Sequence, residues 1–218
     1  MRITIDGPAG SGKSTVARKL AARLEIPYLD TGAMYRAVAY AALRRGVDLN
    51  DPEALLEVAR TMDLDLDCGP THTRVRVDGH DVTEAIRSME VTEATPAVAR
   101  HEGIRTLLVA RQRELGERMG SFVSEGRDQG SVVFPDADVK FVLDATLDKR
   151  AERRHREMQA DGEEVTLDEV RANLEARDAV DAKQWEPLLA SGEAHIIDTT
   201  RRTIAEVIEA MLACLPRG

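Results

Sequence analysis

A glycine-rich segment near the N-terminus has the composition of a phosphate-binding loop. It matches the pattern GxxxxGK[ST] in full and continues into a threonine: Gly7, Pro8, Ala9, Gly10, Ser11, Gly12, Lys13, Ser14 and Thr15. Glycines let successive backbone N–H groups turn inward around phosphate oxygens, and a following helix adds its positive N-terminal dipole. Lys13 supplies charge to the β- and γ-phosphates, and the Ser14 hydroxyl is a ligand for Mg²⁺. The pattern predicts that residues 7–15 bind ATP with Mg²⁺; the alternative is a chance glycine turn.

Two further segments place charged side chains directly after short β-prone runs. Asp30 and Thr31, followed by Arg36, come after a run at 27–29, and Arg127 with Asp128 comes after a run at 122–124. Carboxyl ends of parallel strands form the ligand-binding edge of an α/β sheet. A guanidinium there matches phosphate oxygens with two parallel bonds, so Arg36 is a candidate clamp for an acceptor phosphate. A solvated helix arginine and an ordinary turn salt bridge are the alternatives.

A basic helix is the third candidate. Arg150, Arg153 and Arg154 have i, i+3 and i+4 spacing and therefore share one helix face. Arginines beside a flexible loop suit the stabilisation of charge on a transferring phosphoryl group, although a solvated charged face is equally consistent with the spacing. Further on, Arg177 and Asp181 form either a simple i, i+4 ion pair or a contact to the acceptor.

The elements that carry these residues alternate between strand and helix. Apolar runs around 3–5, 27–29, 122–124, 139–143 and 195–197 predict strands, and helical spacing follows most of them. This alternation predicts an α/β fold with a parallel sheet covered on both faces. Residues 73–77 with Asp78-Gly79 predict an inserted β-hairpin, and the polar stretch 159–164 predicts a mobile loop. Capping boxes begin two late helices, at Thr166 with Glu169 and at Thr203 with Glu206.

Composition limits the function classes. The chain has 218 residues, a formal net charge of −9 and 3% aromatic residues, which disfavours a polyanion-binding surface or base-stacking platform, so no nucleic-acid partner is expected. The two cysteines match no metal-ligand spacing, and neither a signal peptide nor a membrane span is visible, so we expect a cytoplasmic protein and, by default, a monomer. A small-molecule kinase is favoured over an ATP-dependent switch or binding module.

The ordered set of motifs resembles bacterial cytidylate (CMP) kinases, members of the P-loop nucleoside monophosphate kinases. The resemblance is carried by ITIDGPAGSGKST, LDTGAMYRA, VDGHDVTEAIR, EGRDQGSVVFPDA, VKFVLDA and the late RDAVD, and it covers nearly the whole chain. It implies a three-layer P-loop fold with five parallel strands and helices on both faces. It also implies one domain over 1–218, with a core of about 1–60, 98–148 and 190–218, an α+β monophosphate-binding insert at about 61–97 and a helical lid at about 149–185.

The resemblance also implies a reaction and a site. The reaction is transfer of the γ-phosphoryl group of ATP to CMP or dCMP with Mg²⁺, and no covalent nucleophile is needed. The implied catalytic residues are Lys13, Arg127, Arg150 and Arg154, the last two in the lid. The implied CMP-binding residues are Asp30, Thr31, Arg36, Arg105, Arg127, Asp128, Arg177 and Asp181. Of these, Arg36 and Arg127 hold the phosphate, Arg105 and Asp128 contact the cytosine edge, and Arg177 and Asp181 contact the sugar or its phosphate.

Two positions depart from the family pattern. Pro96, next to Thr95, stands where many members have a serine that helps recognise the base. Gln184, next to Lys183, stands where many have a phosphate-binding arginine. The resemblance therefore implies weaker CMP affinity or looser base choice than is usual, with Thr95 and Lys183 as the candidate substitutes.

Overall fold

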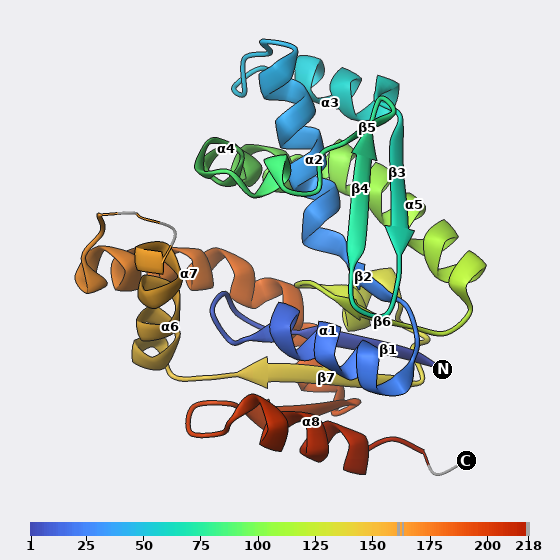
Figure 1. Cartoon of the computed structure of the whole chain (residues 1–218), viewed down its shortest axis with the longest axis vertical. Coiled ribbons are helices and arrows are strands. Elements are labelled where there is room, and N and C mark those ends of the chain that lie inside the picture. Colours follow the sequence, from blue (N-terminus) through green and yellow to red (C-terminus); the bar gives the residue numbers. More distant parts are fainter. Residues whose placement is uncertain (161, 163, 217–218) are drawn as a thin grey trace.

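Five parallel strands form the central sheet (Figure 1). A computed structural model describes residues 1–160, 162 and 164–216, with the side chains of residues 177 and 179–187 outside that description. The strands lie in the order β2–β6–β1–β7–β8. They are β1 (Arg2–Asp6), β2 (Tyr28–Asp30), β6 (Phe122–Glu125), β7 (Val139–Asp144) and β8 (Ala194–Asp198). All of the predicted strands are present and every pairing is parallel, so the predicted fold class is confirmed.

The two faces of β1 serve different purposes because side chains alternate along a strand. Ile3 and Ile5 are fully buried against α1 (Lys13–Leu24) and α8 (Ile204–Ala213) in one apolar core. Thr4 and Asp6 are also fully buried, and they face η2 (Gln129–Val133), a π-helical turn that follows β6. The central strand is thus apolar on one face and polar on the other.

A second core lies on the β2 and β6 side of the sheet. It joins α2 (Thr31–Arg44), α3 (Pro52–Thr61), α4 (Met89–Arg100) and α5 (Glu102–Met119). The helix α5 approaches the sheet closely at Gly116, where an added Cβ would lie 2.6 Å from the Phe134 ring. That ring packs on Phe122 with centroids 4.7 Å apart. Glycine at 116 is therefore required by the packing of α5 on β6.

The insert contains a small antiparallel sheet of β3 (Leu64–Cys68), β4 (Thr73–Val77) and β5 (His80–Asp81), followed by the short 3₁₀ helix η1 (Ala85–Arg87). The predicted hairpin is confirmed: Asp78 and Gly79 form the turn with φ of 51° and 79°. Two successive positive φ values match the twist of a tight hairpin. The sequence prediction did not resolve β3, which pairs with β4 and completes three strands.

The helices α6 (Leu147–Ala160) and α7 (Leu167–Ser191) project together from the sheet (Figure 1). Both predicted capping boxes are present, Thr166 with Glu169 before α7 and Thr203 with Glu206 before α8. Among the side chains that the structure describes, Ala151, Val170 and Leu174 form a buried apolar cluster between α6 and α7.

No helix in the described residues is both long and apolar enough to cross a bilayer. Cys68 and Cys214 are free thiols.

The insert is attached to the free edge of β2 through Thr73. The buried Thr73 hydroxyl donates to the Tyr28 carbonyl at 2.6 Å and accepts from the Asp30 amide at 3.4 Å. The Tyr28 amide in turn donates to the Gly69 carbonyl at 3.0 Å. The loop between β3 and β4 therefore satisfies backbone groups that an edge strand leaves unpaired.

We expect Thr73→Val to lower the free energy of unfolding by about 1–3 kcal/mol, because an isosteric methyl leaves two buried backbone groups without their partner. Urea denaturation measures this. Thr106→Val is the matched control, since the Thr106 hydroxyl is exposed and donates within its own helix to the Glu102 carbonyl at 3.0 Å. Equal, small losses in both variants would contradict a special role for Thr73.

Candidate active site

The P-loop connects β1 to α1 and has a strained backbone. Gly7, Gly10 and Gly12 have φ of 136°, 74° and 90°, which side-chain-bearing residues rarely adopt. Gly12 is the N-cap of α1 and no side chain caps its first turn, so the amides at this end of the helix are available to a phosphate. The Lys13 ammonium donates to the Pro8 carbonyl at 2.7 Å and thereby closes the loop. The local geometry is that of an anion-binding loop.

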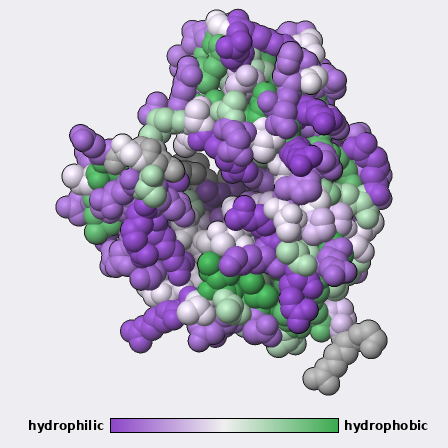
Figure 2. Space-filling model, viewed as in Figure 1, coloured by the Kyte–Doolittle hydropathy of each residue, from purple (hydrophilic) through white to green (hydrophobic). Residues whose placement is uncertain are grey.

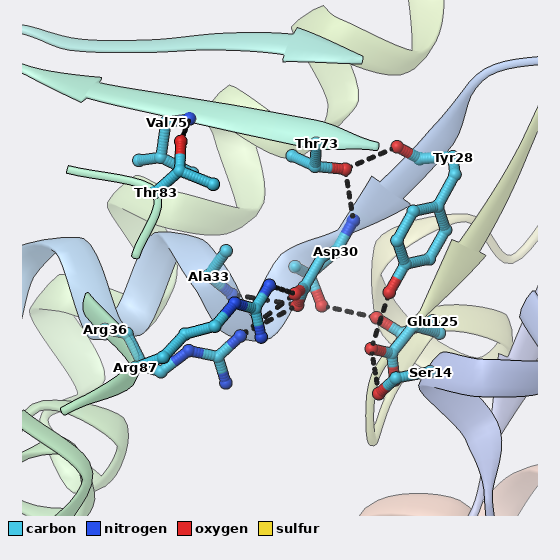
Figure 3. Close-up of polar contacts among 11 residues, drawn as sticks. Ser14, Tyr28, Asp30, Ala33, Arg36, Thr73, Val75, Thr83, Arg87 and Glu125 are labelled. Carbon is cyan, nitrogen blue, oxygen red and sulfur yellow. Dashed lines mark hydrogen bonds and ion pairs between the residues drawn. The ribbon is translucent and has the colours of Figure 1, made fainter. Parts of the chain in front are cut away.

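Glu125 is the last residue of β6 and contacts Ser14 of the P-loop. Its carboxylate accepts from the Ser14 hydroxyl at 2.8 Å and from the Tyr28 hydroxyl at 3.2 Å (Figure 3). Burial raises the pKa of Glu125, the Asp30 charge raises it further, and Lys13 with the Ser14 hydrogen bond opposes both. Burial, followed by the Glu125 charge, also raises the pKa of Tyr28, so the phenol remains a donor. Glu125 therefore orients the hydroxyl that the sequence assigns to Mg²⁺.

Asp30 ends β2 and gathers two arginines. It caps α2 by accepting from the Ala33 amide at 3.0 Å, and it accepts from Arg36 at 2.9 Å and from Arg87 at 3.1 Å (Figure 3). Arg36 comes from α2, whereas Arg87 comes from η1 of the insert. The neighbouring Thr31 hydroxyl donates to the Glu125 carbonyl at 2.7 Å. In this structure, therefore, Asp30 and Arg36 form an ion pair, and Thr31 connects α2 to the end of β6 by a hydrogen bond.

Arg127 and Asp128 follow β6 and contact different parts of the chain. Arg127 donates to the Gly7 carbonyl of the P-loop at 3.3 Å. Asp128 is buried and accepts from Arg105 of α5 at 2.5 Å. Tyr35 of α2 lies close by, since burial and then the Asp128 charge raise the pKa of its phenol to about 12 while Arg105 opposes the shift. Arg127 and Asp128 therefore connect the P-loop with Arg105 on α5.

The arginines of α6 differ in what they contact. The guanidinium of Arg150 is buried and donates to the Ala9 carbonyl at 3.2 Å and to both oxygens of Asp178 on α7. Arg153 donates to the Thr199 carbonyl at 2.6 Å, and more weakly to the Ser11 carbonyl at 3.5 Å. Arg154 instead pairs with Glu157 on its own helix at 3.3 Å. In this arrangement Arg150 and Arg153, rather than Arg154, meet the P-loop.

The remaining candidates from the sequence lie on α7 and α4. The side chains of Arg177 and Asp181, and of Lys183 and Gln184, lie outside the described residues. Pro96 is within α4. The hydroxyl of Thr95 donates to the Val91 carbonyl at 2.6 Å, so its proton is engaged inside that helix.

The surface of the molecule is hollowed between the elements that carry these groups. Figure 2 shows a hollow in the middle of this face, walled mainly by hydrophilic residues, between the insert lobe, the central sheet and the α6–α7 pair. Elements from all three regions therefore border a shared space.

The chain is similar to known proteins over nearly its whole length. The family model described as cytidylate kinase matches residues 3–217. The chain belongs to the cytidylate kinase family. A cytidylate kinase of Geobacillus kaustophilus is 44% identical over 96% of this chain and 94% of its own length. One of Caldanaerobacter subterraneus is 44% identical over 100% of this chain and 96% of its own length.

Some relatives are longer. A bifunctional pantoate ligase/cytidylate kinase of Synechococcus is 49% identical over 94% of this chain, which spans 38% of that protein. Among solved structures, a shikimate kinase from Bacteroides thetaiotaomicron has a TM-score of 0.51 at 15% identity, covering 98% of this chain and 96% of its own. An uncharacterized protein from Eubacterium ventriosum has a TM-score of 0.53 at 16% identity, covering 98% and 96%. At these identities the structural likeness concerns the fold alone.

Several polar residues that contact the candidate site residues were not predicted from the sequence. Glu125 stands directly before the glycine of the EGRD motif, and Asp6 stands directly before the P-loop, so position relative to a motif was the available signal. Arg87 ends the VDGHDVTEAIR motif. The spacing of Arg153 makes it a candidate for contact with a phosphate, but Arg154 shares almost the same helix face. Only the contacts in the structure distinguish the two residues.

We expect Glu125→Gln to lower kcat with Mg²⁺-ATP by about 10–100-fold, the usual effect of removing a group that orients a metal ligand. The amide keeps one acceptor but loses the charge that holds the Ser14 hydroxyl. Steady-state kinetics against Mg²⁺ concentration measures the effect. Glu193→Gln is the control, because Glu193 is exposed and pairs with Lys140 at 2.6 Å on another part of the sheet. Unchanged kcat in Glu125→Gln would contradict this role.

Proposed function

We propose that this chain transfers the γ-phosphoryl group of ATP to CMP, giving ADP and CDP, and that it accepts dCMP in the same way. Membership in the cytidylate kinase family supports the reaction. The structural observation that supports this reaction is that Arg127 and Asp128 are adjacent. Arg127 contacts the Gly7 carbonyl of the P-loop, and Asp128 pairs with Arg105. One short segment thus links the donor site to a hydrogen-bonding site for a base.

The Asp128–Arg105 pair suits a cytosine. A carboxylate accepts from the exocyclic amine of cytosine, whereas uracil presents an acceptor oxygen at that position. The guanidinium of Arg105 donates to ring acceptors on the same edge. A site that relies on these bonds disfavours UMP, because the wrong base leaves buried polar groups unpaired.

The acceptor phosphate is assigned to Arg36 and Arg127. Arg36 has donors in reserve: its buried Nε makes no hydrogen bond within the described part of the chain, although Nη2 contacts Asp30. Two guanidinium groups from different elements fix a phosphate both in position and in orientation. We also assign Asp30 and Thr31 to the walls of this site, and Arg177 and Asp181 to the sugar or its phosphate.

The donor side is assigned to residues 7–15, with Lys13 on the β- and γ-phosphates. The described residues contain no group of three or more His, Cys, Asp or Glu side chains that would hold a metal by themselves. This fits Mg²⁺, which keeps most of its waters and binds through one or two protein oxygens plus substrate phosphates. Ser14, oriented by Glu125, would hold it, and the ion would neutralise charge on the phosphates.

Catalysis then depends on position and charge. Lys13, Arg127, Arg150 and Arg154 are assigned to the phosphates, and Arg153 joins them because it contacts the P-loop region directly. We assign residues 149–185 to a lid and residues 61–97 to an acceptor-binding insert. A cytoplasmic monomer is the expected state, and the free cysteines fit a reducing compartment.

A coupled ADP-release assay with Mg²⁺-ATP and CMP, dCMP, UMP, dTMP and AMP tests the assignment. We expect strong turnover on CMP and dCMP, weak turnover on UMP, and near silence without a monophosphate. A preference for another base would remove the cytidylate assignment while leaving a P-loop kinase. Slow ATP hydrolysis that ignores every acceptor would indicate a switch or binding module.

We expect Arg127→Ala to reduce kcat/KM for CMP by at least about 100-fold, since it removes a charge from the acceptor phosphate and a contact to the P-loop. ATP affinity and thermal stability should stay near wild type. Arg171→Ala is the control, because Arg171 is exposed and pairs with Asp148. Arg113→Ala is not suitable as a control, because Arg113 holds η2. Near-normal efficiency in Arg127→Ala would remove this residue from the site.

A further inference from the structure

Asp6 joins the strand that carries the P-loop to the turn that follows the base-contacting aspartate. It is the last residue of β1, and its side chain is fully buried. Its Oδ1 accepts from the Gln129 amide and its Oδ2 from the Gly130 amide, each at 2.8 Å. Those amides open η2, directly after Asp128. Both oxygens of one carboxylate are therefore used by two consecutive backbone groups of a single turn.

The turn itself is unusual and tightly enclosed. π-helical turns are rare and occur often at functional sites. A Cβ added to Gly130 would lie 2.9 Å from the Thr4 hydroxyl and 3.2 Å from an Asp6 oxygen, so η2 rests directly on β1. Arg113 of α5 fixes the other end of η2 by donating to the Val132 carbonyl at 2.7 Å and the Val133 carbonyl at 3.0 Å. At the start of the turn, Asp6 holds the backbone amides, while the Gln129 side chain accepts from Ser124 at 2.6 Å and donates to Gln112 at 3.3 Å.

We propose that Asp6 is a positioning residue for phosphoryl transfer: its carboxylate holds the Gln129 and Gly130 amides and thereby sets Asp128 and Arg127 in register with the P-loop. Asp6 does not touch the substrate in this role. It acts through the backbone, so its removal displaces the carboxylate that contacts cytosine and the guanidinium that contacts the P-loop. The inference rests on the proposed function, because base selection by Asp128 is the property that Asp6 maintains.

The electrostatic setting makes this role dependent on pH. The pKa of Asp6 is raised to about 6: burial and the Asp128 charge raise it, and the two backbone hydrogen bonds and Lys13 oppose that rise. Among the described residues, the charges identified as acting on Asp6 are those of Lys13 on α1 and Asp128 ahead of η2. Above this pKa both oxygens accept from η2. Below it, one oxygen carries a proton and loses acceptor strength, so base selection should weaken as the pH falls through about 6.

The decisive readout is the ratio of kcat/KM for CMP to that for UMP, measured between about pH 5 and pH 8. Both substrates carry the same phosphate group, so its titration cancels in the ratio. For the wild type we expect the ratio to fall by about tenfold from neutral to acid pH, since small misplacement of a contacting group has effects of this size or larger. The inflection should lie near the pKa of Asp6.

The variant Asp6→Asn provides a second test of the proposal. An amide offers one acceptor and turns its NH₂ toward the other backbone N–H, so the turn loses one bond at every pH. We expect the CMP-to-UMP ratio at neutral pH to fall by about tenfold, its inflection near pH 6 to disappear, and KM for ATP to change less than about threefold. Asp138→Asn is the matched control, because exposed Asp138 accepts from the Arg2 amide at 2.6 Å at the opposite end of β1. Its ratio should equal that of the wild type.

Several outcomes would overturn the proposal. A folded Asp6→Asn enzyme, checked by circular dichroism, that keeps the wild-type ratio would do so, and so would an inflection that persists in that variant. If Asp6→Asn does not fold, the wild-type profile decides, and a flat ratio down to acid pH overturns the role. A wild type that shows no preference for CMP at neutral pH is a different result, because it rejects the proposed function itself.

Discussion

Three adjacent strands of the central sheet end in a buried carboxylate, and the arrangement of the site depends on how these charges are satisfied. Asp6, Asp30 and Glu125 close β1, β2 and β6 with exposed fractions of 0%, 2% and 6%. A buried charge is costly unless it is paired or hydrogen-bonded. Each of the three therefore recruits donors from another part of the chain, and those donors belong to the elements that form the site.

The three carboxylates recruit different donors. Glu125 takes hydroxyls, from Ser14 of the P-loop and from Tyr28. Asp30 takes guanidinium groups, from Arg36 of α2 and Arg87 of the insert, in addition to the Ala33 amide that it caps. Asp6 takes backbone amides at the start of η2. The choice matters because a hydroxyl can turn toward a metal and an arginine can move to a phosphate, whereas a backbone amide stays where it is. The same functional group, a buried carboxylate, thus holds hydroxyls, guanidinium groups and a fixed turn.

The parts around the sheet are held with unequal strength. The insert lobe shares a large apolar core with α2 and α5, and Thr73 ties it to the edge of β2. In the described part of the α6–α7 pair, the buried apolar residues that pack together are Ala151, Val170 and Leu174, and the pair meets the P-loop through polar contacts of Arg150 and Arg153. Among the described residues, α6 and α7 therefore contact the P-loop mainly through polar groups, whereas the insert packs on the central domain mainly through apolar side chains.

The sequence by itself determined the P-loop, the strands, the capping boxes, the hairpin turn and the family, because each depends on residues close together in the chain. A GxxxxGK[ST] segment or an Asp-Gly turn needs only local backbone geometry and neighbouring side chains. Spacing on one helix could not distinguish Arg153 from Arg154, nor show that Arg36 binds Asp30 in this structure. It also did not indicate that Glu125 orients Ser14, 111 residues away, or that Asp6 holds a turn 123 residues later. Those pairings follow from the strand order β2–β6–β1, which places three distant strand ends side by side, and only the folded chain decides which buried charge meets which donor.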